Sequence, residues 1–167
     1  MRYVLVPKAT LVGLEQKTKM LWAKNEQGGL LFGYRKKSGL QVTGFTVPQS
    51  SDLASPVIFK RSSNGHAQLA LSAWKESGGT VDWIGEWHTH PVGNSAPSTT
   101  DIANWVRLAE HVRKPMVFLI LSKFGWYVGL QHHSPKRLVP LQCIESNSTA
   151  SLFGEHTNFH SKANFIL

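Results

Sequence analysis

The chain has 167 residues, a formal net charge of +8 at pH 7, 41% hydrophobic residues and 17% charged residues. This length is sufficient for one domain with a buried core, and the composition excludes a disordered chain. Cys143 is the single cysteine, which excludes an internal disulfide and a zinc site built from several cysteines.

The sequence shows no secretion signal and no membrane span. The first residues contain no long apolar segment, and no stretch approaches the roughly 20 apolar residues that a spanning helix needs. We therefore expect a cytoplasmic protein that has no membrane partner. The basic residues form short clusters at 35–37, 60–61 and 136–137. Such clusters favour a solvated surface or an acidic protein partner over nucleic acid.

The first half of the chain alternates between strand-like and helix-like apolar spacing. Strands are predicted for residues 2–7, 28–35, 40–48 and 56–61. A first helix starts at an N-cap Thr10, and its apolar face carries Leu11, Leu14, Leu21 and Trp22. A second helix, which ends before Gly78 and Gly79, is marked by Ala67, Ala70, Leu71 and Trp74.

The second half continues in the same way. Residues 80–90 predict a buried strand, and a third helix begins near Ser98. The apolar face of this helix consists of Ile102, Trp105, Val106, Ala109 and Val112. Residues 116–122 and 126–131 predict a hairpin. Residues 137–143 predict an edge strand, because Pro140 cannot donate a ladder hydrogen bond.

These elements predict an α/β or α+β fold with a single mixed sheet flanked by helices. We expect one domain over residues 1–143. Residues 144–167 are rich in Ser and Asn but carry several large apolar residues. They predict a C-terminal tail or an arm that docks on the domain or on a partner.

A candidate metal site lies in the stretch GEWHTHPVGNSAPSTTD. His88 and His90 are two residues apart on a predicted strand, so their side chains point the same way. Asp101 falls in the first turn of the following helix, from which it can reach back to the strand end. Two histidines and a carboxylate supply three ligands and leave a fourth position for water, which is the open arrangement of a catalytic zinc site.

Each part of this pattern also has a purely structural interpretation. Ser98 followed three residues later by Asp101 is a helix-capping pattern. Histidines at 88 and 90 can be ordinary strand residues. The combination is more specific than any pair, because each residue lies where an open metal site needs it. The other histidines lack such spacing with a carboxylate, and we interpret them as surface or core residues: His66, His111, His132, His133, His156 and His160.

At these positions the sequence resembles the JAMM (JAB/MPN) zinc metalloproteases. The signature of that family is His-x-His, seven residues of which the first is proline, then serine, two residues and aspartate, which matches His88, His90, Ser98 and Asp101. The family pairs it with an upstream Glu-x-x-Gly-x-Leu-x-Gly, and the stretch EQGGLLFG that starts at Glu26 matches this pattern. The two halves are far apart in the sequence and match independently.

The resemblance implies an MPN/JAB-like fold of the cytidine-deaminase-like type and one Zn²⁺ per chain, held by His88, His90 and Asp101. It also implies that Glu26 is the general base and proton shuttle, and that Ser98 stabilises the tetrahedral intermediate. Glu86 is the competing candidate for the base, because it precedes His88 by two residues and can share its face. The sequence context favours Glu26.

The implied activity is hydrolysis of the amide bond between the C-terminus of a conjugated protein and its target. The short chain and the stretch IGEWHTHP are most similar to bacterial deconjugating isopeptidases of CBASS antiphage operons. There the conjugated protein resembles a nucleotidyltransferase or a ubiquitin-like modifier, and a ubiquitin-activating-like enzyme is encoded nearby. Two alternatives stay open: another JAMM hydrolase, such as a small-molecule amidase or a processing peptidase, and a non-catalytic RadC-like module that binds nucleic acid.

Overall fold

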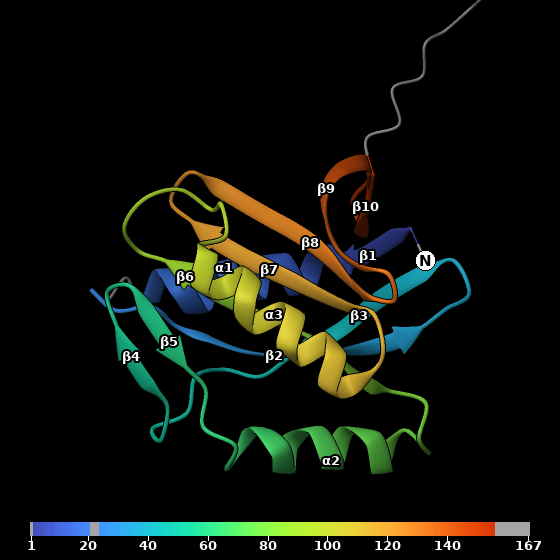
Figure 1. Ribbon diagram of the computed structural model, residues 1–167, viewed down its shortest axis with the longest axis horizontal. Coiled ribbons are helices and arrows are strands. Elements are labelled where there is room, and N and C mark those ends of the chain that lie inside the picture. Colours follow the sequence, from blue (N-terminus) through green and yellow to red (C-terminus); the bar gives the residue numbers. More distant parts are fainter. Residues whose placement is uncertain (1, 21–23, 156–167) are drawn as a thin grey trace, which may run out of the picture.

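The strands close into a barrel in the computed structural model, which describes residues 2–20 and 24–155 (Figure 1). Around the barrel the order is β1, β10, β9, β8, β7, β6, β2, β3. These strands are β1 (Tyr3–Pro7), β2 (Gly28–Arg35), β3 (Gly39–Phe45), β6 (Asp82–His90), β7 (Met116–Ser122), β8 (Gly125–His133), β9 (Lys136–Ser146) and β10 (Ala150–Gly154). The pairs β6–β7 and β1–β3 are parallel, and the other neighbours are antiparallel.

Barrel closure differs from the expected single sheet flanked by helices. Mixed pairing is confirmed, as is the alternation of strands with helices. However, β1 pairs with β3 on one side and with β10 on the other, which joins the two ends of the sheet. Hydrophobic periodicity shows which face of a strand is buried, but it carries no information about which distant strands become neighbours. The sequence pattern therefore could not predict that the sheet closes into a barrel.

The barrel includes part of the segment that we expected to form a tail or a docking arm. We placed the domain end at Cys143 and a tail or docking arm over residues 144–167. In the structure β9 crosses this boundary and ends at Ser146, and β10 returns antiparallel to it. Residues 156–167 lie outside the described residues, so the predicted role of that segment as a tail or arm stays a prediction.

Pro140 does not mark an edge strand, because β9 lies between β8 and β10. Pro140 is paired with Gly129 of β8, whereas the pairing of β9 with β10 starts at Gln142. Pro140 therefore lies outside the register of β9 with β10 and takes no donor from that ladder.

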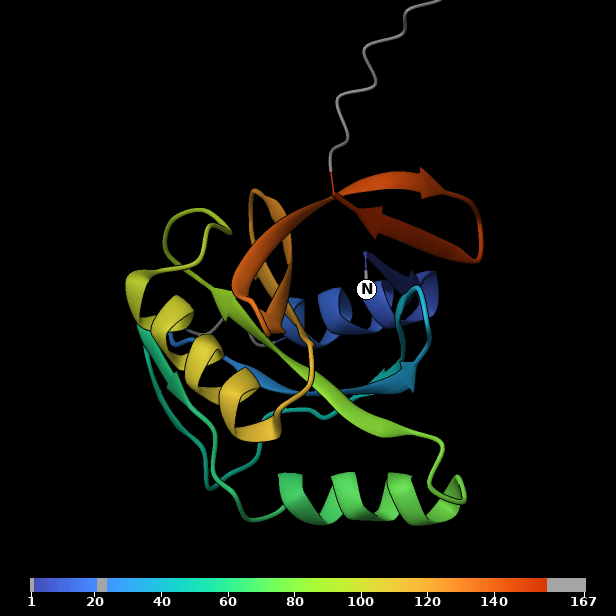
Figure 2. The same cartoon turned by 45° about the vertical axis from the view of Figure 1, so that its right-hand side comes forward.

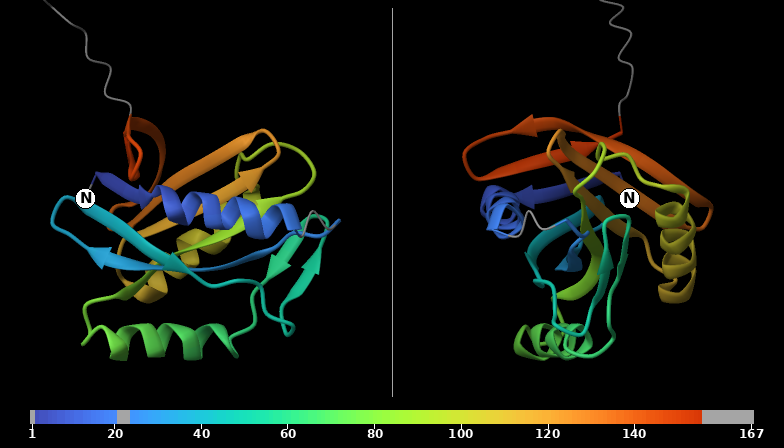
Figure 3. Two further views of the ribbon diagram at one scale, coloured as in Figure 1. Left: turned by 180° about the vertical axis from the view of Figure 1, so that it is seen from behind. Right: turned by 90° about the vertical axis from the view of Figure 1, so that its left-hand side faces the viewer.

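Three helices and a short hairpin surround the barrel within the described ranges. α1 (Lys8–Met20) and α3 (Thr99–Val112) lie on opposite sides of it, and α2 (His66–Glu76) lies at its periphery (Figures 2 and 3). The strands β4 (Leu53–Ser55) and β5 (Ile58–Lys60) form the hairpin. No helix in this part of the chain is long and apolar enough to cross a membrane.

The predicted start of α3 is correct, whereas the predicted start of α1 is wrong. α3 follows its N-cap Ser98 as expected. α1 begins at Lys8, so Thr10 lies inside the first turn and is not the N-cap. Leu21 and Trp22, which were expected on the apolar face of this helix, lie outside the described residues.

β7 separates two parts of the core. Val117 and Leu119 belong to the cluster formed by strands around the barrel and by α1, whereas Phe118 and Ile120 face α3. Trp105 of α3 stacks on Phe118 with ring centroids 4.5 Å apart. Because both faces of β7 are covered, its sequence is a continuous apolar run without polar alternation. This packing holds the N-terminus of α3 against the end of β6.

Candidate metal centre

Two strand histidines and one helix carboxylate meet at the carboxyl end of β6. His88 and His90 point to the same side of the strand, and their Nε2 atoms are 3.1 Å apart. Asp101, in the first turn of α3, places Oδ1 3.3 Å from His88 Nε2 and Oδ2 3.5 Å from His90 Nε2. The structure therefore brings together the three residues that the sequence suggested as metal ligands.

The N-terminus of α3 orients the Asp101 carboxylate. Ser98 Oγ accepts a hydrogen bond from the Asp101 N–H at 3.1 Å. Asp101 Oδ2 accepts one from the Ser98 N–H at 2.7 Å and another from the Ser98 hydroxyl at 2.6 Å. These reciprocal bonds form a capping box, so the capping interpretation of Ser98 is confirmed. The same bonds fix the direction in which the carboxylate points.

The three side chains fit a zinc ion in donor type and in spacing. Imidazole nitrogens and a carboxylate oxygen are ordinary zinc ligands, with bond lengths of about 2.0–2.2 Å. Two such ligands on a tetrahedral ion lie roughly 3.3 Å apart. The separations between His88, His90 and Asp101 are 3.1, 3.3 and 3.5 Å. The two Asp101 distances involve different oxygens, Oδ1 toward His88 and Oδ2 toward His90, and one ligand atom from each residue lies within 4.8 Å of the others, so the cluster is compatible with zinc.

Neighbouring groups prepare these atoms for a cation. His90 Nδ1 lies 3.0 Å from the Asn94 carbonyl, to which its N–H can donate, so that Nε2 is the ring nitrogen that faces Asp101, where it can carry either a proton or a metal ion. Hydrogen bonding to Asp101 raises the pKa of His90. Burial alone would raise the pKa of Asp101, but hydrogen bonds from His88 and His90 hold it well below its usual range. The Asp101 carboxylate is therefore ionised at neutral pH.

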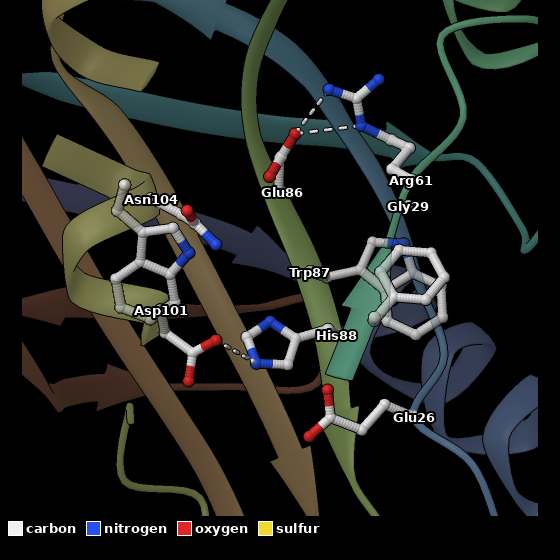
Figure 4. A pocket seen from close by; sticks show the side chains of 10 residues that line it. Glu26, Gly29, Arg61, Glu86, Trp87, His88, Asp101 and Asn104 are labelled. Carbon is white, nitrogen blue, oxygen red and sulfur yellow. Dashed lines mark hydrogen bonds and ion pairs between the residues drawn. The ribbon is translucent and has the colours of Figure 1, made fainter. Parts of the chain in front are cut away.

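Glu26, just before β2, is the buried acid beside this cluster. Its Oε1 lies 3.9 Å from His90 Nε2, and its side chain points into the same pocket as those of His88 and Asp101 (Figure 4). Burial raises the pKa of Glu26, although the two histidines oppose this shift. A carboxylate whose pKa is raised takes up a proton more readily than an exposed one, which suits a group that accepts a proton and returns it.

Glu86 shares the pocket but is engaged elsewhere. Arg61 Nε and Nη2 both donate to Glu86 Oε1, at 3.0 and 2.8 Å. The guanidinium carbon of Arg61 also lies 5.4 Å from the centroid of the Trp83 ring. Figure 4 shows Glu86 turned toward Arg61, on the part of β6 that precedes His88. The expectation that Glu86 lies on the same face as His88 agrees with this pocket, but its carboxylate serves an ion pair. Arg61 carried no signal in the sequence that could have identified this partnership.

The remaining histidines do not join the metal centre. His66 is fully buried; its Nε2 lies 3.0 Å from Asp52 Oδ2, and its Nδ1 lies 2.7 Å from Thr46 Oγ1. It is a core histidine that does have a carboxylate partner, although Asp52 is fourteen residues away in the sequence. His111, His132 and His133 lie outside the metal cluster, and His156 and His160 lie outside the described residues.

Comparison with known proteins places the chain in a family. Residues 14–136 match the prokaryotic homologs of the JAB domain. A protein of Pseudomonas aeruginosa named CD-NTase/cGAS isopeptidase is 34% identical over 125 residues, which are 74% of this chain and 79% of that protein. An Escherichia coli protein of the same name is 28% identical over 127 residues, which are 76% of this chain and 81% of the relative.

A solved structure supports the same fold. The solution structure of a Desulfitobacterium hafniense protein superimposes with a TM-score of 0.57 and 23% sequence identity. The match covers 81% of this chain and 87% of that protein. Together with the sequence matches, the barrel, its helices and the residues gathered at the end of β6 lead to one assignment: this chain belongs to the family of prokaryotic JAB-domain proteins.

Proposed function

We propose that this protein is a zinc-dependent isopeptidase that releases a conjugated nucleotidyltransferase of the CD-NTase type from its target. One observation carries the proposal: His88, His90 and Asp101 converge, with the Glu26 carboxylate 3.9 Å from His90 Nε2. The names of the curated relatives support the substrate class. By the same reasoning, we expect the protein to act in the bacterial cytoplasm, in antiphage defence.

In this mechanism His88, His90 and Asp101 would hold one zinc ion. When bound, zinc supplies a Lewis acid and a water molecule with a pKa near 7. Glu26 accepts the proton of the attacking water and returns it to the lysine amine as the amide bond breaks. The raised pKa of Glu26 supports this role, because a proton shuttle works best when its pKa is near the working pH.

Ser98 takes part as the donor that stabilises the negative oxygen of the tetrahedral intermediate. Its hydroxyl donates to Asp101 Oδ2 in the structure. For the proposed role, the hydroxyl must donate to the substrate oxygen instead, while the backbone bonds of the capping box continue to hold Asp101. Single donors of this kind typically contribute about 10²–10³-fold to turnover.

The decisive experiment uses a defined conjugate. The C-terminal peptide of a CD-NTase is joined to the ε-amine of a lysine in a second peptide, and release of the amine is followed in single turnovers. We expect cleavage by the zinc-loaded protein and loss of cleavage after chelation. A ubiquitin-like C-terminus and a linear peptide bond of the same sequence serve as comparison substrates. Preferential cleavage of either comparison substrate contradicts the proposed substrate class.

Variants separate metal binding from proton transfer. His88→Ala and Asp101→Ala should lose zinc, as measured by elemental analysis. Glu26→Gln should retain zinc and lose at least about 10²-fold in turnover, whereas Glu86→Gln should lose much less. Full zinc content in both ligand variants contradicts the assignment of the ligands. A zinc-loaded Glu86→Gln that is inactive beside an active Glu26→Gln contradicts the assignment of the base.

A further inference from the structure

Thr89 lies between the two histidines, on the opposite face of β6. Its side chain is buried, with 8% of its surface exposed. Its hydroxyl accepts a hydrogen bond from the Gln27 N–H at 3.0 Å, and its own N–H donates to the Gln27 carbonyl at 2.7 Å. Both backbone polar groups of Gln27 are therefore bonded to Thr89, and Gln27 is the residue next to Glu26.

This pair departs from a regular antiparallel ladder. The register of β2 with β6 starts at Gly28 and His88, so Gln27 would be the next residue opposite Thr89. In a regular hydrogen-bonded pair the two residues exchange N–H and carbonyl bonds. Here a side-chain hydroxyl replaces the backbone carbonyl as the acceptor of the Gln27 N–H. The register of β2 with β6 ends at Gly28, and Gln27 is held on β6 through these two bonds to Thr89.

Glu26, the residue before Gln27, has its carboxylate Oε1 3.9 Å from His90 Nε2. The Glu26 N–H donates to the Ser55 carbonyl of β4 at 2.8 Å, and the Phe59 N–H bonds its carboxylate. The hairpin thus holds Glu26 on one side, and the Thr89 bonds hold its neighbour on the other. Since His88 and His90 flank Thr89, one side chain connects the backbone of the metal ligands to the backbone of the acid.

We infer that Thr89 is a positioning residue that sets the place of the Glu26 carboxylate relative to His88 and His90 through its hydroxyl bond to the Gln27 N–H. This inference rests on the proposed function for its effect on turnover, but the bond itself can be tested without activity. An error of about 1 Å in the position of a reacting group can cost about 10²-fold in rate. Threonine can be replaced by serine without loss of this acceptor, but not by valine.

The test compares Thr89→Val, Thr89→Ser and Thr18→Val. Thr18 is also buried, and its hydroxyl donates within α1 to the Glu15 carbonyl, so Thr18→Val is a matched loss of one hydroxyl outside the site. In Thr89→Val we expect amide hydrogen exchange at Gln27 at least about tenfold faster, measured by NMR, with zinc content unchanged. We expect kcat to fall about 10²-fold with KM nearly constant. Thr89→Ser should stay near wild type in both measurements.

A double-mutant cycle identifies the path of the effect. If Thr89 acts through Glu26, Thr89→Val adds little to the loss already caused by Glu26→Gln. Full additivity with Glu26→Gln, unchanged Gln27 exchange in Thr89→Val, or equal losses in the serine and valine variants overturns the inference. If the wild type cleaves no conjugate, the proposed function fails, while Gln27 exchange still decides whether the hydroxyl bond holds this segment.

Discussion

Histidine has two different roles in this molecule, and its neighbours determine which one applies. Both ring nitrogens of His66 are occupied by protein groups, Thr46 Oγ1 and Asp52 Oδ2, in a fully buried setting. The Nε2 atoms of His88 and His90 instead converge with a carboxylate at separations typical of shared coordination. A His–carboxylate contact alone therefore does not identify a metal site, whereas the convergence of two ring nitrogens and a carboxylate is compatible with one.

Ser98 combines a structural role and a proposed catalytic role, and one substitution can separate them. Ser98→Ala removes the cap of α3 and should lower the free energy of unfolding by about 1 kcal/mol. If the hydroxyl also stabilises the intermediate, turnover should fall by about 10²-fold. Urea unfolding and single-turnover cleavage measure the two effects. Ser98→Thr, which keeps the hydroxyl, is the control. If Ser98→Ala lowers stability but leaves turnover unchanged, Ser98 acts only as the cap of α3 and has no catalytic role.

The two helices that follow α1 differ in how they use their apolar residues. In α3, Trp105 and Ala109 are buried against the sheet. In α2 the buried residue is His66, whereas Leu71 and Trp74, which marked this helix in the sequence, are 51% and 50% exposed. The apolar spacing thus predicted both helices correctly, but only α3 uses the marked face for packing on the barrel.

Because of this difference, we expect two tryptophan substitutions to lower the free energy of unfolding by unequal amounts. Trp105→Ala removes a ring stacked on Phe118 and should cost about 3–5 kcal/mol in the free energy of unfolding. Trp74→Ala should cost less than about 1 kcal/mol, because half of that side chain is exposed. Urea denaturation of the metal-free proteins provides both values. Equal costs would mean that α2 is packed more tightly in solution than its exposure indicates.

Arg35 forms hydrogen bonds to several segments at the end of the barrel opposite the candidate metal centre. Its guanidinium binds Asp82 at the start of β6, and also the carbonyls of Trp83 and Pro115. Lys114, in the loop after α3, also contacts Asp82 at 3.1 Å. Burial opposes the charge of Asp82, but hydrogen bonds from Arg35 and Lys114 hold the pKa of this carboxyl below its usual value.

The lowered pKa of Asp82 gives a pH dependence with a defined sign. A depressed carboxyl contributes stability that is fully present above its unfolded pKa of about 3.9 and is lost as pH falls through its folded pKa. The difference in unfolding free energy between wild type and Asp82→Asn should therefore be constant from pH 7 to about pH 5 and shrink toward pH 3. Urea titrations at each pH test this expectation. A constant difference down to pH 3 would show that the ion pairs add no stability.

The whole molecule depends on β1 and β10 to close the barrel. β10 pairs with β1 over five residues and with β9 on its other side. β1 has β3 as its second neighbour. Closure gives each barrel strand two neighbours, which satisfies backbone groups that an open sheet would expose at its edges.

Two truncations test what closure contributes. Removing residues 147–167 deletes β10 and should abolish cooperative unfolding or lower the midpoint strongly, because β1 and β9 each lose a neighbour. Removing residues 156–167 leaves every barrel strand in place and should retain a cooperative transition. Thermal unfolding followed by circular dichroism distinguishes the two. A stable protein without β10 would contradict the role assigned to closure.

The sequence by itself determined the elements and the candidate chemistry. Alternation along a strand placed His88 and His90 on one face, and the capping pattern placed Asp101 in a first helical turn; both rules act over a few residues. The upstream glutamate motif, through the family resemblance, singled out Glu26 as the candidate general base. Because such rules act over a few residues, they also predicted most strands and helices. The errors fell at the ends of elements, such as the start of α1.

Only the tertiary structure decided the contacts between residues that are distant in the chain. It showed that β1 and β10 close the sheet. It also showed that Glu86 is bound by Arg61, whereas Glu26 lies beside His90. It also left the marked face of α2 exposed. Each of these outcomes depends on which strands become neighbours and on where loops bring side chains together. Local periodicity reports the burial of a face and not the identity of what covers it, so these contacts had to be seen in the folded protein.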